Sequence, residues 1–155
     1  MNEHRPNLAA IRVVDVMSQP AVFVGESDSL AKAAQILAEH NLVSAPVVNV
    51  AHECVGMLSA TDLARGWAEQ VISAADGYVH NTMSRNVRSV QEHDLLLDAA
   101  QKMQQASLHR MPVLRNKKAV GVISSSDIIA AFLKAQPHSR TADASAWRAD
   151  CKATS

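Results

Sequence analysis

Two stretches of the chain place hydroxyl groups and a carboxylate behind a glycine, in the same order. They read Gly56-Met57-Leu58-Ser59-Ala60-Thr61-Asp62 and Gly121-Val122-Ile123-Ser124-Ser125-Ser126-Asp127. Each runs from an apolar segment into the expected start of a helix, where free backbone N–H groups favour a bound phosphate. The glycine favours a ligand site because it lets a ligand approach the strand backbone. The same Ser-x-x-Asp spacing also fits a purely structural capping box, so both interpretations stay open.

Few other residues are spaced for chemistry. His52 and Cys54 lie close together, but no second Cys/His pair follows at a zinc-finger spacing, so a metal- or redox-responsive module is only a third hypothesis. The chain has no Gly-x-Ser-x-Gly, P-loop, His-Glu-x-x-His or Cys-x-x-Cys motif. We therefore expect a sensor and not an enzyme, with no required cofactor and no metal.

Composition excludes several classes of protein. The 155 residues include 15 basic and 15 acidic ones, and only 3% of all residues are aromatic. A neutral chain argues against nucleic-acid or membrane binding, which need a basic excess, and few aromatics argue against base stacking. No apolar run reaches the roughly 18 residues of a membrane span, and the polar start is unlike a signal peptide. With only two cysteines, we expect a cytoplasmic protein.

An internal repeat organises the chain. A shift of 66 residues aligns Met17-Ser18 with Met83-Ser84, Ala33-Ala34-Gln35 with Ala99-Ala100-Gln101, and Pro46-Val47 with Pro112-Val113. A one-residue deletion then aligns the two glycine-to-aspartate motifs. The matches are spread along the unit, so the chain contains two copies of one supersecondary unit.

Each copy predicts the same elements. Apolar residues at helical spacing predict helices over 29–41 and 95–107, with Asp28 and Asp94 as N-caps. Pro-led apolar runs and short polar turns predict a hairpin after each helix, and second helices follow over 61–74 and 126–135. Short strands at 21–24 and 87–90 and lead-in helices ending at Met17 and Met83 complete the set.

The expected fold class is α/β (α+β): two β-α-β-β-α repeats packed sheet to sheet with pseudo-two-fold symmetry, because one repeat cannot bury its apolar sheet face alone. We expect the first repeat with its lead-in helix at 8–74 and the second at 75–135. Residues 136–155 are polar and lack periodicity, which predicts a disordered tail in which Trp147 is the one feature able to dock.

Over residues 8–135 the chain resembles the tandem cystathionine-β-synthase (CBS) domain pair, or Bateman module. The resemblance depends on the repeated Met-Ser and Pro-Val pairs and above all on the two glycine-to-aspartate motifs. It implies a regulatory module that binds an adenosyl ligand, such as AMP, ADP, ATP or S-adenosylmethionine, in the cleft between repeats. It also implies a homodimer that signals to an unidentified effector protein. The competing hypothesis is a ligand-free scaffold for dimerisation or interaction.

The resemblance also implies residue roles. Asp62 and Asp127 would accept hydrogen bonds from the ribose, and Thr61 and Ser126 would meet phosphate. A carboxylate suits two vicinal hydroxyls, because charge-assisted bonds are the stronger ones. The full set of candidate ligand contacts is Ser44, Ala45, Ser59, Thr61, Asp62, His109, Arg110, Ser124, Ser126 and Asp127.

The two clefts are expected to differ. His109-Arg110 resembles a basic pair that holds nucleotide phosphate, whereas Val43-Ser44 stands at the equivalent place in the first repeat. We expect Asp62, His109 and Arg110 to form the cleft for a phosphorylated ligand, and Asp127 with Ser44 to form one that is empty or takes a less charged ligand. Residues 14–65 carry two bases and six acids, whereas residues 80–133 carry seven bases and four acids, which predicts attraction between repeats and a basic lip at Arg110.

Overall fold

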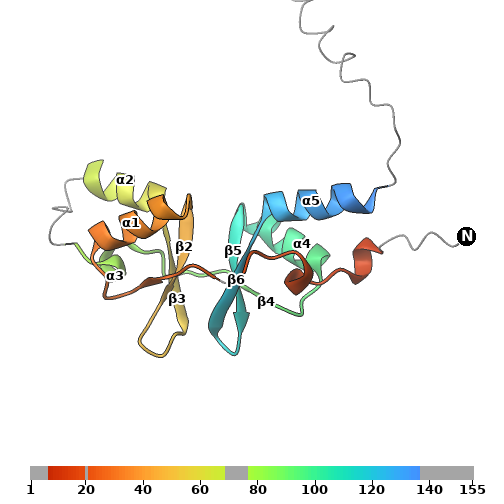
Figure 1. The fold of residues 1–155 in the computed structure, drawn as a ribbon, viewed down its shortest axis with the longest axis horizontal. Helices are drawn as coiled ribbons and strands as arrows, with labels where there is room; N and C mark the ends of the chain where they lie inside the picture. Colours follow the sequence, from red (N-terminus) through yellow and green to blue (C-terminus); the bar gives the residue numbers. More distant parts are fainter. Residues whose placement is uncertain (1–6, 20, 69–76, 137–155) are drawn as a thin grey trace, which may run out of the picture.

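The repeat predicted from the sequence forms two similar lobes (Figure 1). The computed structural model describes residues 7–19, 21–68 and 77–136. Its elements, in chain order, are η1 (Leu8–Ala10), η2 (Val13–Asp15), β1 (Val24–Gly25), α1 (Leu30–Glu39), β2 (Ser44–Val48), β3 (Cys54–Ser59), α2 (Ala60–Ala68), α3 (Val79–Thr82), β4 (Val90–Gln91), α4 (Leu96–Ala106), β5 (Arg110–Arg115), β6 (Lys118–Ser124) and α5 (Ser125–Ala135). The predicted fold class is confirmed.

Each lobe contains one three-stranded sheet, in the orders β1-β2-β3 and β4-β5-β6. The first two strands of each sheet are parallel, and the second and third form the predicted antiparallel hairpin. The two sheets lie next to each other in the middle of the molecule, where β2 contacts β6, and the helices lie away from this junction (Figure 1). The predicted sheet-to-sheet packing is therefore confirmed.

Helices α1 and α4 form because their apolar residues recur on one face. Leu30, Ala33 and Leu37 of α1 are buried, and so are their equivalents in α4, Leu96, Ala99 and Met103. Burial of each large aliphatic side chain stabilises the fold by about 1.5–3 kcal/mol. Both helices are followed by left-handed residues, Asn41 (φ 51°) and Ser107 (φ 52°), which turn the chain into the next strand.

The helix N-caps differ by one residue from the prediction. Ser29 caps α1 with its hydroxyl, and Leu95 occupies the N-cap position of α4 without a side-chain bond. Asp28 accepts a hydrogen bond from the Gly25 N–H (2.8 Å), and Asp94 accepts one from the Gln91 N–H (2.9 Å). These aspartates are therefore engaged in closing the turn that precedes each helix.

The lead-in segments are exchanged between the lobes. The Val13 N–H donates to the carbonyl of Asp94 (2.9 Å), and its equivalent Val79 donates to that of Asp28 (3.0 Å). Met17 lies in the core of the second lobe and Met83 in the core of the first. The segment that opens each repeat thus packs into the core of the other repeat. A division of the chain between residues 74 and 75 does not describe this exchange.

Glycines at two equivalent positions allow this exchange. A Cβ on Gly121 would lie 2.7 Å from the Ser18 carbonyl oxygen and 2.7 Å from Met17 Sδ. A Cβ on Gly56 would lie 2.9 Å from the Ser84 carbonyl oxygen. The space beside each glycine is therefore filled by the lead-in chain of the other repeat. The expectation that the glycines admit a ligand to the strand is wrong.

Two predictions fall partly outside the described residues. These are the repeat boundary near residue 74 and the disordered tail, of which only Gln136 is described. No helix in the described part of the chain is long and apolar enough to cross a membrane.

Candidate ligand-binding site

The second glycine-to-aspartate motif ends in a complete capping box at the start of α5. Oδ2 of Asp127 accepts hydrogen bonds from the Ser124 N–H (2.8 Å) and the Ser124 hydroxyl (2.9 Å). In return, Oγ of Ser124 accepts one from the Asp127 N–H (3.2 Å). Among the described residues, no hydrogen-bond donor reaches Oδ1 of Asp127.

The first motif is built in the same way at the start of α2. Oδ2 of Asp62 accepts a hydrogen bond from the Ser59 N–H (2.9 Å), and Oγ of Ser59 accepts one from the Asp62 N–H (3.0 Å). Arg65 Nη1 lies 3.9 Å from the other carboxylate oxygen, Oδ1. The structural interpretation is thus confirmed for both motifs. It does not exclude ligand binding, because capping occupies only one oxygen of each carboxylate.

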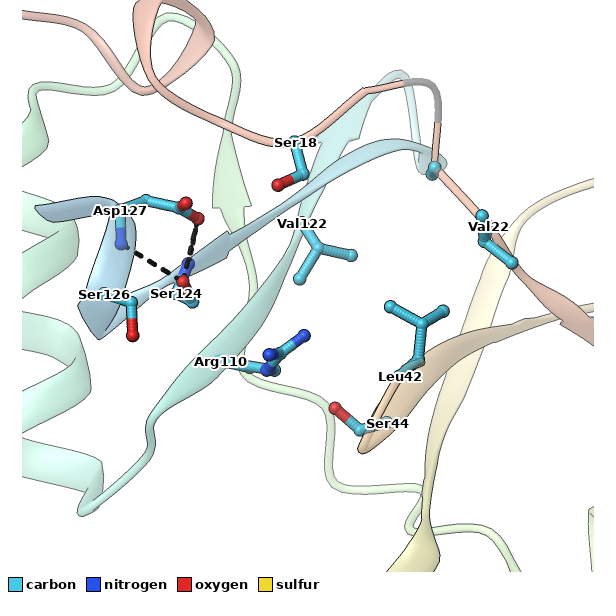
Figure 2. Close-up of a pocket in the computed structure, with 10 residues that line it drawn as sticks. Ser18, Val22, Leu42, Ser44, Arg110, Val122, Ser124, Ser126 and Asp127 are labelled. Carbon is cyan, nitrogen blue, oxygen red and sulfur yellow. Dashed lines mark hydrogen bonds between the residues drawn. The ribbon is translucent and has the colours of Figure 1, made fainter. Parts of the chain in front are cut away.

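A cavity of about 340 Å³ lies beside Asp127, between the two lobes. Its polar wall is formed by residues of the second motif together with Arg110, and Leu42 and Ser44 reach it from the first lobe (Figure 2). The lining residues are Ser18, Ala21, Val22, Leu42, Ser44, Arg110, Val122, Ser124, Ser126 and Asp127.

The cavity has two chemically different sides. Val22, Leu42 and Val122 point toward one another on one side, whereas Ser126 and Asp127 lie on the other (Figure 2). The Arg110 side chain extends from β5 into the space between them, toward Ser44 on β2. Such a cavity can accept a flat apolar ring at one end and hydroxyl or anionic groups at the other.

Arg110 lines the cavity of Asp127, which the sequence did not predict. We expected it to share a cleft with Asp62, yet it lines the cavity of Asp127. The reason is local: β5 pairs with β6 of the same repeat, and this register sets Arg110 opposite Ser124. The expected combination of Asp127 with Ser44 is present, but it includes the cation that was assigned to the other cleft.

His109 does not accompany Arg110. It lines a separate cavity of about 450 Å³, mostly apolar, between α4 and α5. Consecutive residues entering a strand point to opposite sides, so two adjacent basic residues do not act as one pair here. Ala45 is also absent from the Asp127 cavity, because its side chain is fully buried in the core of the first lobe.

Several lining residues were not predicted from the sequence. Val22, Leu42 and Val122 are apolar, and Ser18 lies outside the two glycine-to-aspartate motifs. The exchange of lead-in segments brings Ser18 and Val22 to the cavity. One signal was available, since Ser18 and Leu42 both recur at the shift of 66 residues, as Ser84 and Leu108.

His52 and Cys54 were the candidates for a metal- or redox-responsive module. The described residues contain no group of three or more His, Cys, Asp or Glu side chains able to hold a metal ion. The Cys54 thiol lies 3.6 Å from the Gly56 carbonyl, and burial raises its pKa above the ordinary value. A higher pKa lowers the thiolate fraction and thus the reactivity of this cysteine.

Solved structures of CBS domain pairs share the fold of this chain. The CBS domain pair of protein MJ0100, in complex with 5′-methylthioadenosine and S-adenosyl-L-methionine, superposes with a TM-score of 0.73 at 26% identity, covering 82% of this chain and 99% of that one. CBSX2 in complex with AMP superposes with a TM-score of 0.69 at 26% identity, covering 79% and 96%.

Several sequence relatives carry enzyme names, but this chain matches only a part of each of these. The L-aspartate semialdehyde sulfurtransferase of Methanocaldococcus jannaschii is 28% identical over 132 residues, which is 84% of this chain and 25% of the relative. The chain thus spans about a quarter of that enzyme. The family model of the CBS domain matches twice, at residues 13–69 and 78–134, once on each repeat. With these two matches, the chain belongs to the CBS domain family.

Proposed function

We propose that this chain is a regulatory module that binds an adenosyl ligand in the cavity of Asp127. The single observation that carries the proposal is the cavity between the lobes, which Asp127 and Arg110 line together with an apolar side. The adenine ring packs among Val22, Leu42 and Val122. The ribose hydroxyls donate to Oδ1 of Asp127, the oxygen that capping leaves free.

The ligand that this cavity favours is a phosphorylated one. Ser124 and Ser126 stand at the start of α5, and Arg110 supplies a positive charge beside them. Solved CBS proteins that are 26% identical to this chain hold AMP in one case and S-adenosylmethionine with 5′-methylthioadenosine in another, which supports an adenosyl ligand. The preference for phosphate, first expected at Asp62, is therefore reassigned to Asp127. Asp62, with Ser59 and Thr61, remains the proposed second site.

The module acts through another chain. A ligand that binds one arrangement of the lobes more tightly than another shifts their populations, and an effector protein reads this shift. Regulation and not catalysis is thus the proposed role, with no required cofactor.

A homodimer is the proposed assembly. Trp67 on α2 and Phe132 on α5 stand at equivalent positions of the two repeats and are 51% and 49% exposed. Both helices lie on the same side of the molecule (Figure 1), and a second copy is proposed to pack against this side. Sedimentation equilibrium should give a dimer that Phe132→Ser weakens and that the equally exposed Leu97→Ser on α4 does not; a wild-type monomer at all concentrations would contradict this assembly.

Calorimetric titration tests the ligand. AMP, ADP, ATP and S-adenosylmethionine are titrated into the wild type, Asp127→Asn and Asp98→Asn. Asparagine keeps an oxygen that can cap α5 but loses the charge, so we expect AMP to bind Asp127→Asn about tenfold or more weakly. Asp98→Asn, an exposed change on α4, should bind as the wild type does. No binding by any of the four ligands would refute the proposal.

One observation supports a second candidate, the ligand-free scaffold. Both aspartates form complete capping boxes, so each has a structural role without any ligand. On this alternative, Asp127→Ala destabilises the fold by about 1 kcal/mol but leaves partner binding intact. The same titration separates the two candidates, because a scaffold gives no heat with any adenosyl ligand.

A further inference from the structure

Positions 44 and 110 are equivalent in the two repeats, but they differ in charge. Ser44 opens β2 and lies opposite Ser59 of the first motif. Arg110 opens β5 and lies opposite Ser124 of the second. The backbone hydrogen bonds next to the two positions are equivalent as well. The Ala60 N–H donates to the Val43 carbonyl (2.9 Å), and the Ser125 N–H donates to the His109 carbonyl (2.9 Å).

Both positions line the same cavity, although they belong to different lobes. The pseudo-two-fold axis that exchanges the repeats carries position 44 onto 110 and position 110 onto 44. This pair is thus mapped onto itself, whereas Asp127 is carried onto Asp62. A side chain at position 110 is therefore placed to face both motifs, and a single arginine stands where two would complete the symmetry.

The Arg110 guanidinium is not committed to a structural role. Within the described residues it forms no ion pair and donates no side-chain hydrogen bond, and its side chain points into the gap between β5 and β2 (Figure 2). By contrast, Arg115 on the same strand is paired with Glu92.

We infer that Arg110 is the one anion-recognising group shared by both aspartate motifs, so that each chain binds one anionic adenosyl ligand and its second site takes an uncharged one. This inference rests on the proposed function. An anion held at one motif recruits the guanidinium, and Ser44 then offers the other motif no second cation. Arg65 lies 3.9 Å from Oδ1 of Asp62 and so is paired with the carboxylate of that motif. Two anions would also repel each other across the gap.

Arg88 is another possible source of charge. It stands 66 residues after Val22 and is exposed. Val22 lies on the apolar side of the cavity, away from Ser126 (Figure 2), so the equivalent place near Asp62 corresponds to the base and not the phosphate. Arg88 is therefore positioned to stack on a ring, and we expect it to contribute nothing to the count of bound anions.

Titration of AMP and of 5′-methylthioadenosine, which lacks phosphate, tests the inference. The wild type should bind one AMP but two 5′-methylthioadenosine molecules per chain. Arg110→Gln should weaken AMP about 10- to 100-fold and leave 5′-methylthioadenosine unchanged. Ser44→Arg restores the missing cation, so it should raise the AMP count from one to two. Arg88→Gln should leave that count at one, and thermal unfolding checks that each variant is folded.

The outcomes separate this inference from the proposed function. Two AMP molecules per wild-type chain, one AMP per folded Ser44→Arg chain, or equal loss of both ligands in Arg110→Gln would overturn the sharing of Arg110 while adenosyl binding stands. If Ser44→Arg does not fold, Arg110→Gln decides alone. Absence of binding by both ligands refutes the proposed function itself.

Discussion

Substituting Gly121 by alanine tests the exchange of lead-in segments. The new Cβ would lie 2.7 Å from both the Ser18 carbonyl oxygen and Met17 Sδ. A methionine sulfur can move, but the Ser18 carbonyl is held by the backbone: it accepts from the Val122 N–H (3.1 Å), and the Ser18 N–H donates to the Val122 carbonyl (2.9 Å). The lead-in chain must therefore shift away from β6 and lengthen both bonds.

The expected cost follows from these contacts. Overpacking costs about 1–3 kcal/mol. Each of the two weakened backbone hydrogen bonds costs at most about 0.5–1.5 kcal/mol more. Alanine also lowers the conformational entropy of the unfolded chain, which offsets about 0.4–1 kcal/mol of this cost. We expect Gly121→Ala to lower the free energy of unfolding by about 1–4 kcal/mol, measured by urea denaturation and circular dichroism. Since Ser18 lines the cavity, AMP binding should weaken as well.

Gly25→Ala is the matched control. Its Cβ would lie 3.1 Å from the Asp28 carboxylate, which belongs to a side chain and not to the backbone, and Gly25 has no positive φ. We expect a change in stability below about 1 kcal/mol for this variant. If Gly121→Ala is as stable as Gly25→Ala, the close approach of the lead-in chain is not what the glycine serves.

Two more predictions concern stability. The hydrogen bond from Arg115 (Nη2 to Oε2, 2.6 Å) holds the pKa of Glu92 below its ordinary value, so this pair stabilises the fold above about pH 4.3, the value of an unfolded glutamate, and loses its effect as the pH falls through the lower folded pKa. Unfolding of wild type and Arg115→Met between pH 3 and 6 should show their difference shrinking toward pH 3, and a constant difference would contradict the assignment. Asp62→Ala should lower the free energy of unfolding by about 1 kcal/mol through loss of the α2 cap, whereas Asp62→Asn should cost less.

The helices and hairpins were predictable because their signals are local. Apolar spacing identified α1 and α4 to within two residues at each end, and the Pro-Val runs located β2 and β5. The internal repeat carries each of these signals twice, once in each copy. The capping boxes were predictable for the same reason, because Ser124 and Asp127 are three residues apart.

The composition of the cavity was not predictable, because it depends on contacts between distant segments. Which repeat receives each lead-in segment is decided by the tertiary packing of Met17 and Met83, and Gly121 makes sense only beside Ser18. The place of Arg110 in the cavity of Asp127 was missed, although strand register sets it opposite Ser124. The separation of His109 from Arg110, by contrast, could have been foreseen from the two-residue period of a strand.

The position of the ligand is the central claim, and backbone amide NMR with added AMP tests it most directly. We expect the largest chemical-shift changes at Ser18, Val122, Ser124 and Asp127, which surround the cavity between the lobes. Saturable shifts confined to the cavity of His109 between α4 and α5, or no saturable shifts at all, would contradict the account.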